Sequence, residues 1–181
     1  MNKNVRNLFV LLCLILISTV TYSAIKVPSE VTFEGEVYEQ AYQKGDGINT
    51  NRITEYLRKG ENLDTYVKLV AIMEFPETTD VKDLAEYLIK VHKQKYPSLA
   101  RNIIVKNDGS EAQVDYIAAK GDITEFDIIR VLKKDDHVIL YQYVYRNYSP
   151  LNTSDNTKWR NNLTQNKSKW VELMMQVNYI K

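Results

Sequence analysis

The sequence predicts an α+β fold, in which one antiparallel sheet of about six or seven strands is packed by two main helices. Three observations lead to this prediction. Several short runs rich in β-branched and aromatic residues are separated by turn residues. Two longer segments repeat apolar residues at helical spacing. The run His137–Tyr148 (HVILYQYVYRNY) has apolar or aromatic side chains on both of its faces, which is typical of a central strand covered on each side.

The first half of the chain contains three of the expected strands. Val31–Tyr38 alternates and is expected to form one strand, with Gly35 at a bulge. Ile53–Leu57 forms the second. Lys68–Phe75 is a short apolar run whose periodicity fits either a strand or a helix. We favour a strand, because Pro76 and turn residues follow so closely.

The first helix is expected over Asp80–Tyr96. Thr79 or Asp80 can cap its N-terminus, Asp83 lies in its first turn, and Pro97 ends it. One apolar stripe at helical spacing would pack on the sheet: Val81, Leu84, Ala85, Leu88, His92 and Tyr96.

Four strands and a second helix complete the domain. Asp108-Gly109 is a strong hairpin signal, and turn residues separate the later runs, so consecutive antiparallel pairing is expected. The strands are Asn102–Val105, Ala112–Ala119, Glu125–Lys133 and His137–Tyr148. The second helix covers Asn156–Gln176, with Ser154 or Asp155 as its cap. Its stripe comprises Trp159, Leu163, Asn166, Trp170, Leu173, Met174 and Val177.

The N-terminus has the three parts of a secretory signal peptide. Lys3 and Arg6 precede the apolar stretch Leu8–Val20, and small residues follow. Residues 1–23 are therefore predicted to be a signal peptide and residues 24–181 a single globular domain, with cleavage after Ser23 or, alternatively, Ala24. The apolar stretch is shorter than the roughly 20 residues of a membrane span. No stable span is expected after cleavage; an uncleaved anchor is the alternative.

Composition constrains the compartment and the chemistry. The only cysteine, Cys13, lies inside the predicted signal peptide, so the mature protein would have neither a disulfide nor a thiolate nucleophile. Small secreted eukaryotic domains usually contain disulfides. Their expected absence here favours a bacterial periplasmic or secreted protein. Loss of Lys3 and Arg6 changes the formal charge from +1 to −1, and such a balance argues against nucleic acid as a partner.

The order of elements resembles the PsbP-like proteins, named for an extrinsic photosystem II subunit. The resemblance lies in AQVDYIAA, then FDIIRVLKKDDHVILYQYVY, then a polar loop and a helix that begins TKW and ends WVELMMQV. It implies an α/β/α sandwich and, because PsbP-like proteins include binding and assembly factors, a non-enzymatic role. A second resemblance concerns ITEYLRKGENLDTYVKLVAIMEF, which is similar to a segment of small exported bacterial proteins of no known function. In that segment an aromatic residue lies a few residues after a Lys-Gly-Glu turn, and Tyr66 holds this position here.

The sequence has no recognisable catalytic, cofactor or metal motif. The two histidines, His92 and His137, have no HxxxH or HxH companion. No GxSxG elbow and no phosphate-binding loop is present. An exported hydrolase that uses His137 with Asp135 or Asp136 remains an alternative hypothesis.

We therefore expect an exported binding or accessory protein, whose partner is a protein or a small molecule in the periplasm or outside the cell. A secreted factor directed at a host is a further alternative. The tyrosines of the run His137–Tyr148 can form either a packing face or the aromatic wall of a cleft, and packing is favoured. The candidate binding residues are Tyr141, Tyr143, Tyr145, Arg146, Tyr148 and Trp159.

Overall fold

The computed structural model describes residues 25–45, 51–78, 80–95, 100–106, 108–135 and 137–180. The predicted signal peptide (residues 1–23) and its cleavage site at Ser23 or Ala24 lie outside the described residues. So do four other residues named above: Thr79, Tyr96, Pro97 and Asp136.

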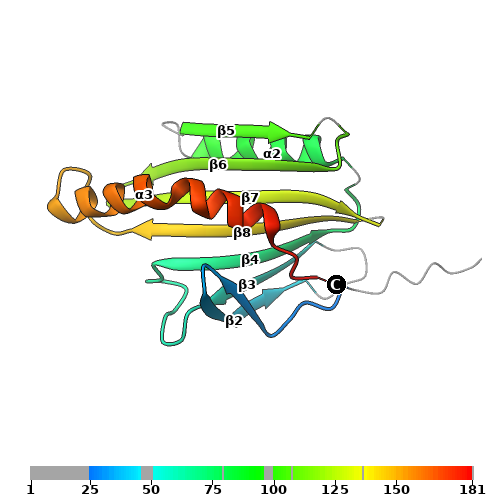
Figure 1. Cartoon of the computed structure of the whole chain (residues 1–181), viewed down its shortest axis with the longest axis horizontal. Helices are drawn as coiled ribbons and strands as arrows, with labels where there is room; N and C mark the ends of the chain where they lie inside the picture. Colours follow the sequence, from blue (N-terminus) through cyan, green and yellow to red (C-terminus); the bar gives the residue numbers. More distant parts are fainter. Residues whose placement is uncertain are drawn as a thin grey trace, which may run out of the picture.

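Eight antiparallel strands form one sheet in the order β1-β2-β3-β4-β8-β7-β6-β5 (Figure 1). Each half of the sheet is a four-strand meander, and pairing of β4 with β8 joins the halves at the centre. The strands are β1 (Glu30–Phe33), β2 (Glu36–Lys44), β3 (Arg52–Leu57), β4 (Lys68–Phe75), β5 (Ala100–Val105), β6 (Glu111–Lys120), β7 (Ile123–Lys134) and β8 (His137–Asn147). Lys68–Phe75 is thus a strand, as favoured from the sequence.

The expected count of six or seven strands is corrected to eight, because the first expected strand is a hairpin. The chain reverses at Glu34 and Gly35, which have φ angles of 55° and 78°. Positive φ at two successive residues is the geometry of a tight hairpin turn. Gly35 therefore occupies a turn between β1 and β2, and not a bulge within one strand.

Two helices cover opposite faces of the sheet, which makes the fold an α/β/α sandwich. Helix α2 (Val81–Lys95) packs on β6 and β7, and α3 (Ser154–Gln176) packs on the other face against β7 and β8 (Figure 1). Asp80 caps α2 by accepting a hydrogen bond of 2.9 Å from the Asp83 backbone N–H. Thr153 caps α3, in place of the expected Ser154 or Asp155.

Strand β8 is the central two-faced strand that the sequence predicts. Ile139, Tyr141 and Tyr143 lie in the core beneath α3, whereas Val138 and Leu140 lie in the core beneath α2. All five side chains are buried. Because strand side chains alternate between faces, a strand between two helical layers must be apolar on both sides.

The chain after α3 runs back across the sheet toward β1 (Figure 1). The Arg130 guanidinium donates to the Val177 carbonyl, the Ile180 N–H donates to the Tyr141 hydroxyl at 3.3 Å, and the Tyr179 hydroxyl donates to the Thr32 carbonyl at 3.2 Å. These bonds hold the C-terminal segment over the tyrosine face of β8. Neither helix that the structure describes is long and apolar enough to cross a membrane.

Candidate functional site

Four of the candidate binding residues meet in one open groove of about 490 Å³. Tyr145, Arg146 and Tyr148 come from the end of β8 and the residue after it, and Trp159 comes from the second turn of α3. The remaining lining residues are Val67, Asn147, Ser149, Asp155, Lys158 and Asn162. The groove therefore lies where the chain leaves the sheet and enters the last helix.

Two of the aromatic rings that line this groove are stacked on each other. The ring centroids of Tyr145 and Trp159 are 5.4 Å apart and their planes differ by 18°. Trp170 packs edge-on against Tyr145 with centroids 5.1 Å apart, which fixes the stack from below. Trp159 is only 6% exposed, and its indole Nε1 has no hydrogen-bond partner among the described residues.

Arg146 is held in place by three neighbours. Its guanidinium forms an ion pair with Glu125, the residue opposite it on β7. It lies 3.8 Å from the centre of the Tyr66 ring, a cation–π contact, and Nη1 donates to the Tyr148 hydroxyl at 3.2 Å. Because Glu125 neutralises Arg146, the guanidinium adds donors to the groove and little net charge.

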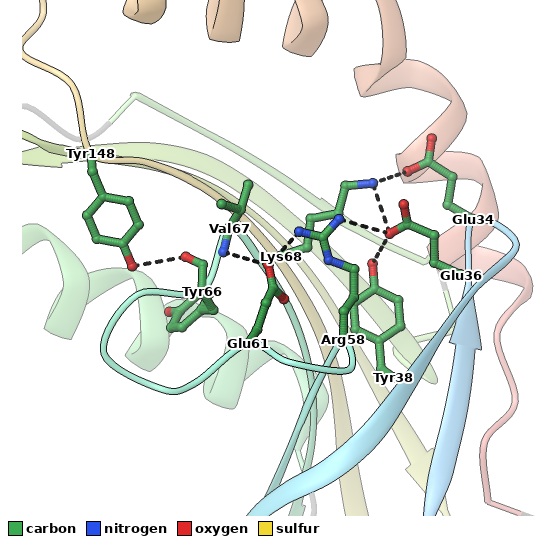
Figure 2. Close-up of polar contacts among 9 residues, drawn as sticks. All are labelled: Glu34, Glu36, Tyr38, Arg58, Glu61, Tyr66, Val67, Lys68 and Tyr148. Carbon is green, nitrogen blue, oxygen red and sulfur yellow. Dashed lines mark hydrogen bonds and ion pairs between the residues drawn. The ribbon is translucent and has the colours of Figure 1, made fainter.

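Tyr148 ties the loop at residues 58–67 to the end of β8. Its hydroxyl lies 2.9 Å from the Tyr66 carbonyl oxygen and 3.2 Å from that of Asp64, and its ring is 37% exposed (Figure 2). Within the loop, the Val67 N–H donates to Glu61 Oε1 at 3.2 Å. The wall that Val67 contributes to the groove is thus fixed by hydrogen bonds on both sides.

An ion-pair network anchors the other side of the same loop (Figure 2). Arg58 pairs with Glu61 at 2.5 Å and with Glu36 at 3.7 Å, and Lys68 lies 3.2 Å from both Glu34 and Glu36. Glu34 lies in the turn between β1 and β2, and Glu36 is the first residue of β2. The hairpin turn missed in the sequence therefore supplies the carboxylates that position this loop.

Tyr141 and Tyr143 do not line the groove. Both have 0% exposed surface and pack beneath α3, as the packing interpretation of the tyrosine row requires. We therefore leave them out of the candidate site, which retains Tyr145, Arg146, Tyr148 and Trp159.

A second, smaller cavity of about 150 Å³ lies on the α2 face of the sheet. Sequence reasoning missed its carboxylates, which come from β3 and β7. The sequence signal that could have revealed them is the alternation of side chains along β7, where Glu125 and Asp127 share a face with the buried Ile129 and Val131. The lining residues are Glu55, Tyr66, Leu69, His92, Tyr116, Glu125, Asp127, Gln142, Val144 and Arg146.

Burial controls the protonation of two of these carboxyl groups. Asp127 is 3% exposed, and Oδ1 accepts a hydrogen bond of 2.7 Å from Gln142 Nε2. Burial, together with the negative charge of Glu125, raises the pKa of Asp127 to about 8. Burial also raises the pKa of Glu55, and the positive charge of Arg146 opposes that rise. The cavity therefore contains a carboxyl group that titrates near neutral pH.

The histidine of the hydrolase hypothesis has a different carboxylate beside it. His137 Nδ1 lies 3.0 Å from Glu74 Oε1, and Glu74 also pairs with Arg52. His137 lines neither the groove nor the α2-face cavity. Within the described ranges, no cluster of three or more His, Cys, Asp or Glu side chains could hold a metal ion. The role of His137 in hydrolysis stays a prediction.

Comparison with known proteins places the chain in a family. A protein-family model matches residues 25–179 of the chain. The chain belongs to this family. The matched range includes every strand and both helices described above, and therefore both the groove and the cavity. A search of curated protein sequences finds no match.

Proposed function

We propose that the protein is an exported, non-enzymatic binding module that holds a small ligand in the groove between the end of β8 and α3. The observation that carries this proposal is the convergence of Tyr145, Arg146, Tyr148 and Trp159 on one open groove. Apolar surface with a few converging polar groups is the usual composition of a ligand site. The resemblance to PsbP-like proteins, which include binding factors, supports the same role.

The groove favours a neutral ligand with a flat apolar face and hydrogen-bonding edges. The half-buried Tyr145 ring offers apolar surface beside Trp159, which is only 6% exposed, and Tyr148 and Asn162 add polar groups to the lining. The charges are compensated within the protein: Arg146 pairs with Glu125, and Lys158 lies 3.0 Å from Asp155. A sugar ring has this combination of a flat C–H face and hydroxyl edges, so we propose neutral saccharides as the ligand class.

Calorimetric titration of the mature domain tests this proposal. The probes are glucose, N-acetylglucosamine, cellobiose and diacetylchitobiose. We expect at least one to bind, and expect Trp159→Ala and Tyr148→Ala each to weaken that binding at least tenfold. Tyr87→Ala is the matched control, because Tyr87 is 61% exposed on α2 and does not line the groove. Absence of binding, or equal losses in all three variants, would contradict the proposal.

Export is the second part of the proposal. Its supports are the charged, apolar and small-residue regions of residues 1–23, the position of the only cysteine within them, and a family match that begins at residue 25. Expression of the full chain in a bacterium, followed by N-terminal sequencing of the periplasmic and secreted fractions, tests it. We expect the mature chain to begin at Ala24 or Ile25. Recovery of the full-length chain with the cells alone would count against export.

A further inference from the structure

Exposed apolar side chains gather at one end of the sheet. Four connections lie at this end in the described part of the chain: the β1–β2 turn, the β3–β4 loop, the β6–β7 turn and the segment between β8 and α3. Each has a large apolar side chain, at least 37% exposed, in the connection or within two residues of it. Six of the ten exposed large apolar side chains among the described residues are therefore at this end: Val37, Leu63, Val67, Ile123, Tyr148 and Leu151.

The strand register shows that these connections are neighbours in space. Leu57 at the end of β3 pairs with Leu69 near the start of β4, and Lys68 at that start pairs with Tyr145 near the end of β8. The start of β2 likewise pairs with the end of β3, and the start of β7 with the end of β8. Figure 1 shows the β3–β4 loop and the N-terminal turn of α3 at this same end.

Two of these connections form a wall of the groove. Val67 and Tyr148 line it, whereas Leu63 lies four residues before Val67 and Leu151 three residues after Tyr148. The two segments are tied together, because the Tyr148 hydroxyl donates to the carbonyls of both Asp64 and Tyr66. We call Leu63, Val67, Tyr148 and Leu151 the apolar rim of the groove.

The segments that carry the apolar rim have no net charge. Residues 58–67 contain two cations, Arg58 and Lys59, and two carboxylates, Glu61 and Asp64. Residues 148–153 contain no charged side chain. The rim therefore gives no electrostatic preference for a charged group, and the part of a ligand that contacts it is expected to be uncharged and apolar.

A hydrocarbon chain is the ligand group that such a rim stabilises. Single exposed apolar residues are normal on protein surfaces, but a cluster beside a groove marks an interaction surface. Leu63 and Leu151 have no hydrogen-bonding group in their side chains, so they offer little to the hydroxyls of a longer saccharide. They do remove the surface of a hydrocarbon chain from water, which is favourable in proportion to the area covered.

From these observations we propose that the ligand of the groove is a saccharide that carries an alkyl or acyl chain. The sugar occupies the groove beside Tyr145 and Trp159, and the chain lies across the apolar rim. This inference rests on the proposed saccharide site and narrows its ligand class from free sugars to glycolipids.

Calorimetric titration of the mature domain with matched glycosides tests the proposal. The probes are the methyl and octyl β-glycosides of glucose and of N-acetylglucosamine, with the octyl compounds kept below the concentration at which they form micelles. We expect an octyl glycoside to bind at least tenfold more tightly than its methyl counterpart, because burial of about two methylene groups suffices for that gain. Tetraethylene glycol octyl ether has the same chain without a sugar, and it should bind at least tenfold more weakly than the octyl glycoside.

Variants of exposed residues locate the site of the chain. Leu63→Ser and Leu151→Ser, introduced together, should reduce the ratio of octyl to methyl affinity at least fivefold. Ile104→Ser is the matched control, because Ile104 is 54% exposed on β5 and does not line the groove. An unchanged ratio in the double variant, or an equal loss in Ile104→Ser, would overturn the proposal.

The outcomes also separate this inference from the saccharide site on which it rests. Equal affinity for methyl and octyl glycosides would overturn the glycolipid inference and leave the saccharide site standing. Equal binding of the octyl ether and the octyl glycosides would also overturn it, since the sugar would then contribute nothing. Absence of binding by every probe would contradict both proposals.

Discussion

Replacement of Asp127 by Asn should change the pH dependence of stability in a direction fixed by burial. In the native state Asp127 keeps its proton to about pH 8, whereas in the unfolded chain it loses the proton near its ordinary pKa of 3.8. Between these values the native state binds one proton more than the unfolded state does. Stability contributed by this group is therefore complete at low pH and is lost as the pH increases toward 8.

The size of the effect follows from the linkage slope. One proton of difference corresponds to about 1.4 kcal/mol per pH unit. Asparagine has no titrating proton and nearly the same shape as aspartate. We compare the two proteins by subtracting the free energy of unfolding of the wild type from that of Asp127→Asn. This difference should increase by up to about 4 kcal/mol between pH 4.5 and 7.5. Other titrating groups are common to both proteins and largely cancel in the difference.

Urea unfolding followed by circular dichroism at pH 4.5, 6, 7.5 and 9 measures this difference. We expect the asparagine variant to gain stability over the wild type at each step up to pH 7.5, and the gain to level off near pH 8. Asp115→Asn provides a buried comparison on the other face of the sheet. A difference that stays constant with pH, or that decreases as the pH increases, would refute the assignment of a native proton to Asp127.

Two further predictions concern the backbone and the loop beside the groove. Gly45 and Gly60 both have φ of 86°, but a Cβ at Gly45 would collide with the Asn51 carbonyl oxygen, whereas at Gly60 it meets nothing within 4 Å. Gly60→Ala should lower the free energy of unfolding, measured in urea, by about 1 kcal/mol, and Gly45→Ala should lower it by about 2 kcal/mol more. Equal losses of stability in the two variants would rule out the collision. Tyr148→Phe should destabilise the domain by about 1 kcal/mol and speed amide exchange in residues 58–67, because the hydrogen bond to the Tyr66 carbonyl is lost; unchanged exchange there would show that the hydroxyl does not hold the loop.

The sandwich and its central strand could be predicted because they depend on local patterns. The run His137–Tyr148 is apolar on both faces, and the structure buries Leu140 and Tyr141 on opposite sides of the sheet. The hairpin at Glu34 could not be recognised in the same way. Glutamate seldom adopts positive φ, so Glu34-Gly35 resembles a strand interruption more than a turn.

The groove and the α2-face cavity differ in how far the sequence could indicate them. The sequence indicates Tyr145 and Trp159, because large aromatic residues at the end of a strand and the start of a helix are recognisable without a structure. The α2-face cavity could not be found in this way. Glu55 of β3 and Asp127 of β7 come together only because β4 pairs with β8, and that pairing connects segments far apart in the chain. Hairpin signals indicate which consecutive strands pair with each other. They carry no information on a pairing between distant strands such as β4 and β8.

Chemical-shift mapping of the mature domain with the saccharide probes tests the central claim most directly. If the groove is the ligand site, the amides that shift with saturation will be those of residues 145–149 and 155–162, together with Val67 and the indole N–H of Trp159. Tyr87 and the rest of the outer face of α2 should stay unchanged. Shifts confined to another surface, or no saturable shift with any of the probes, would contradict the assignment of this groove as a binding site.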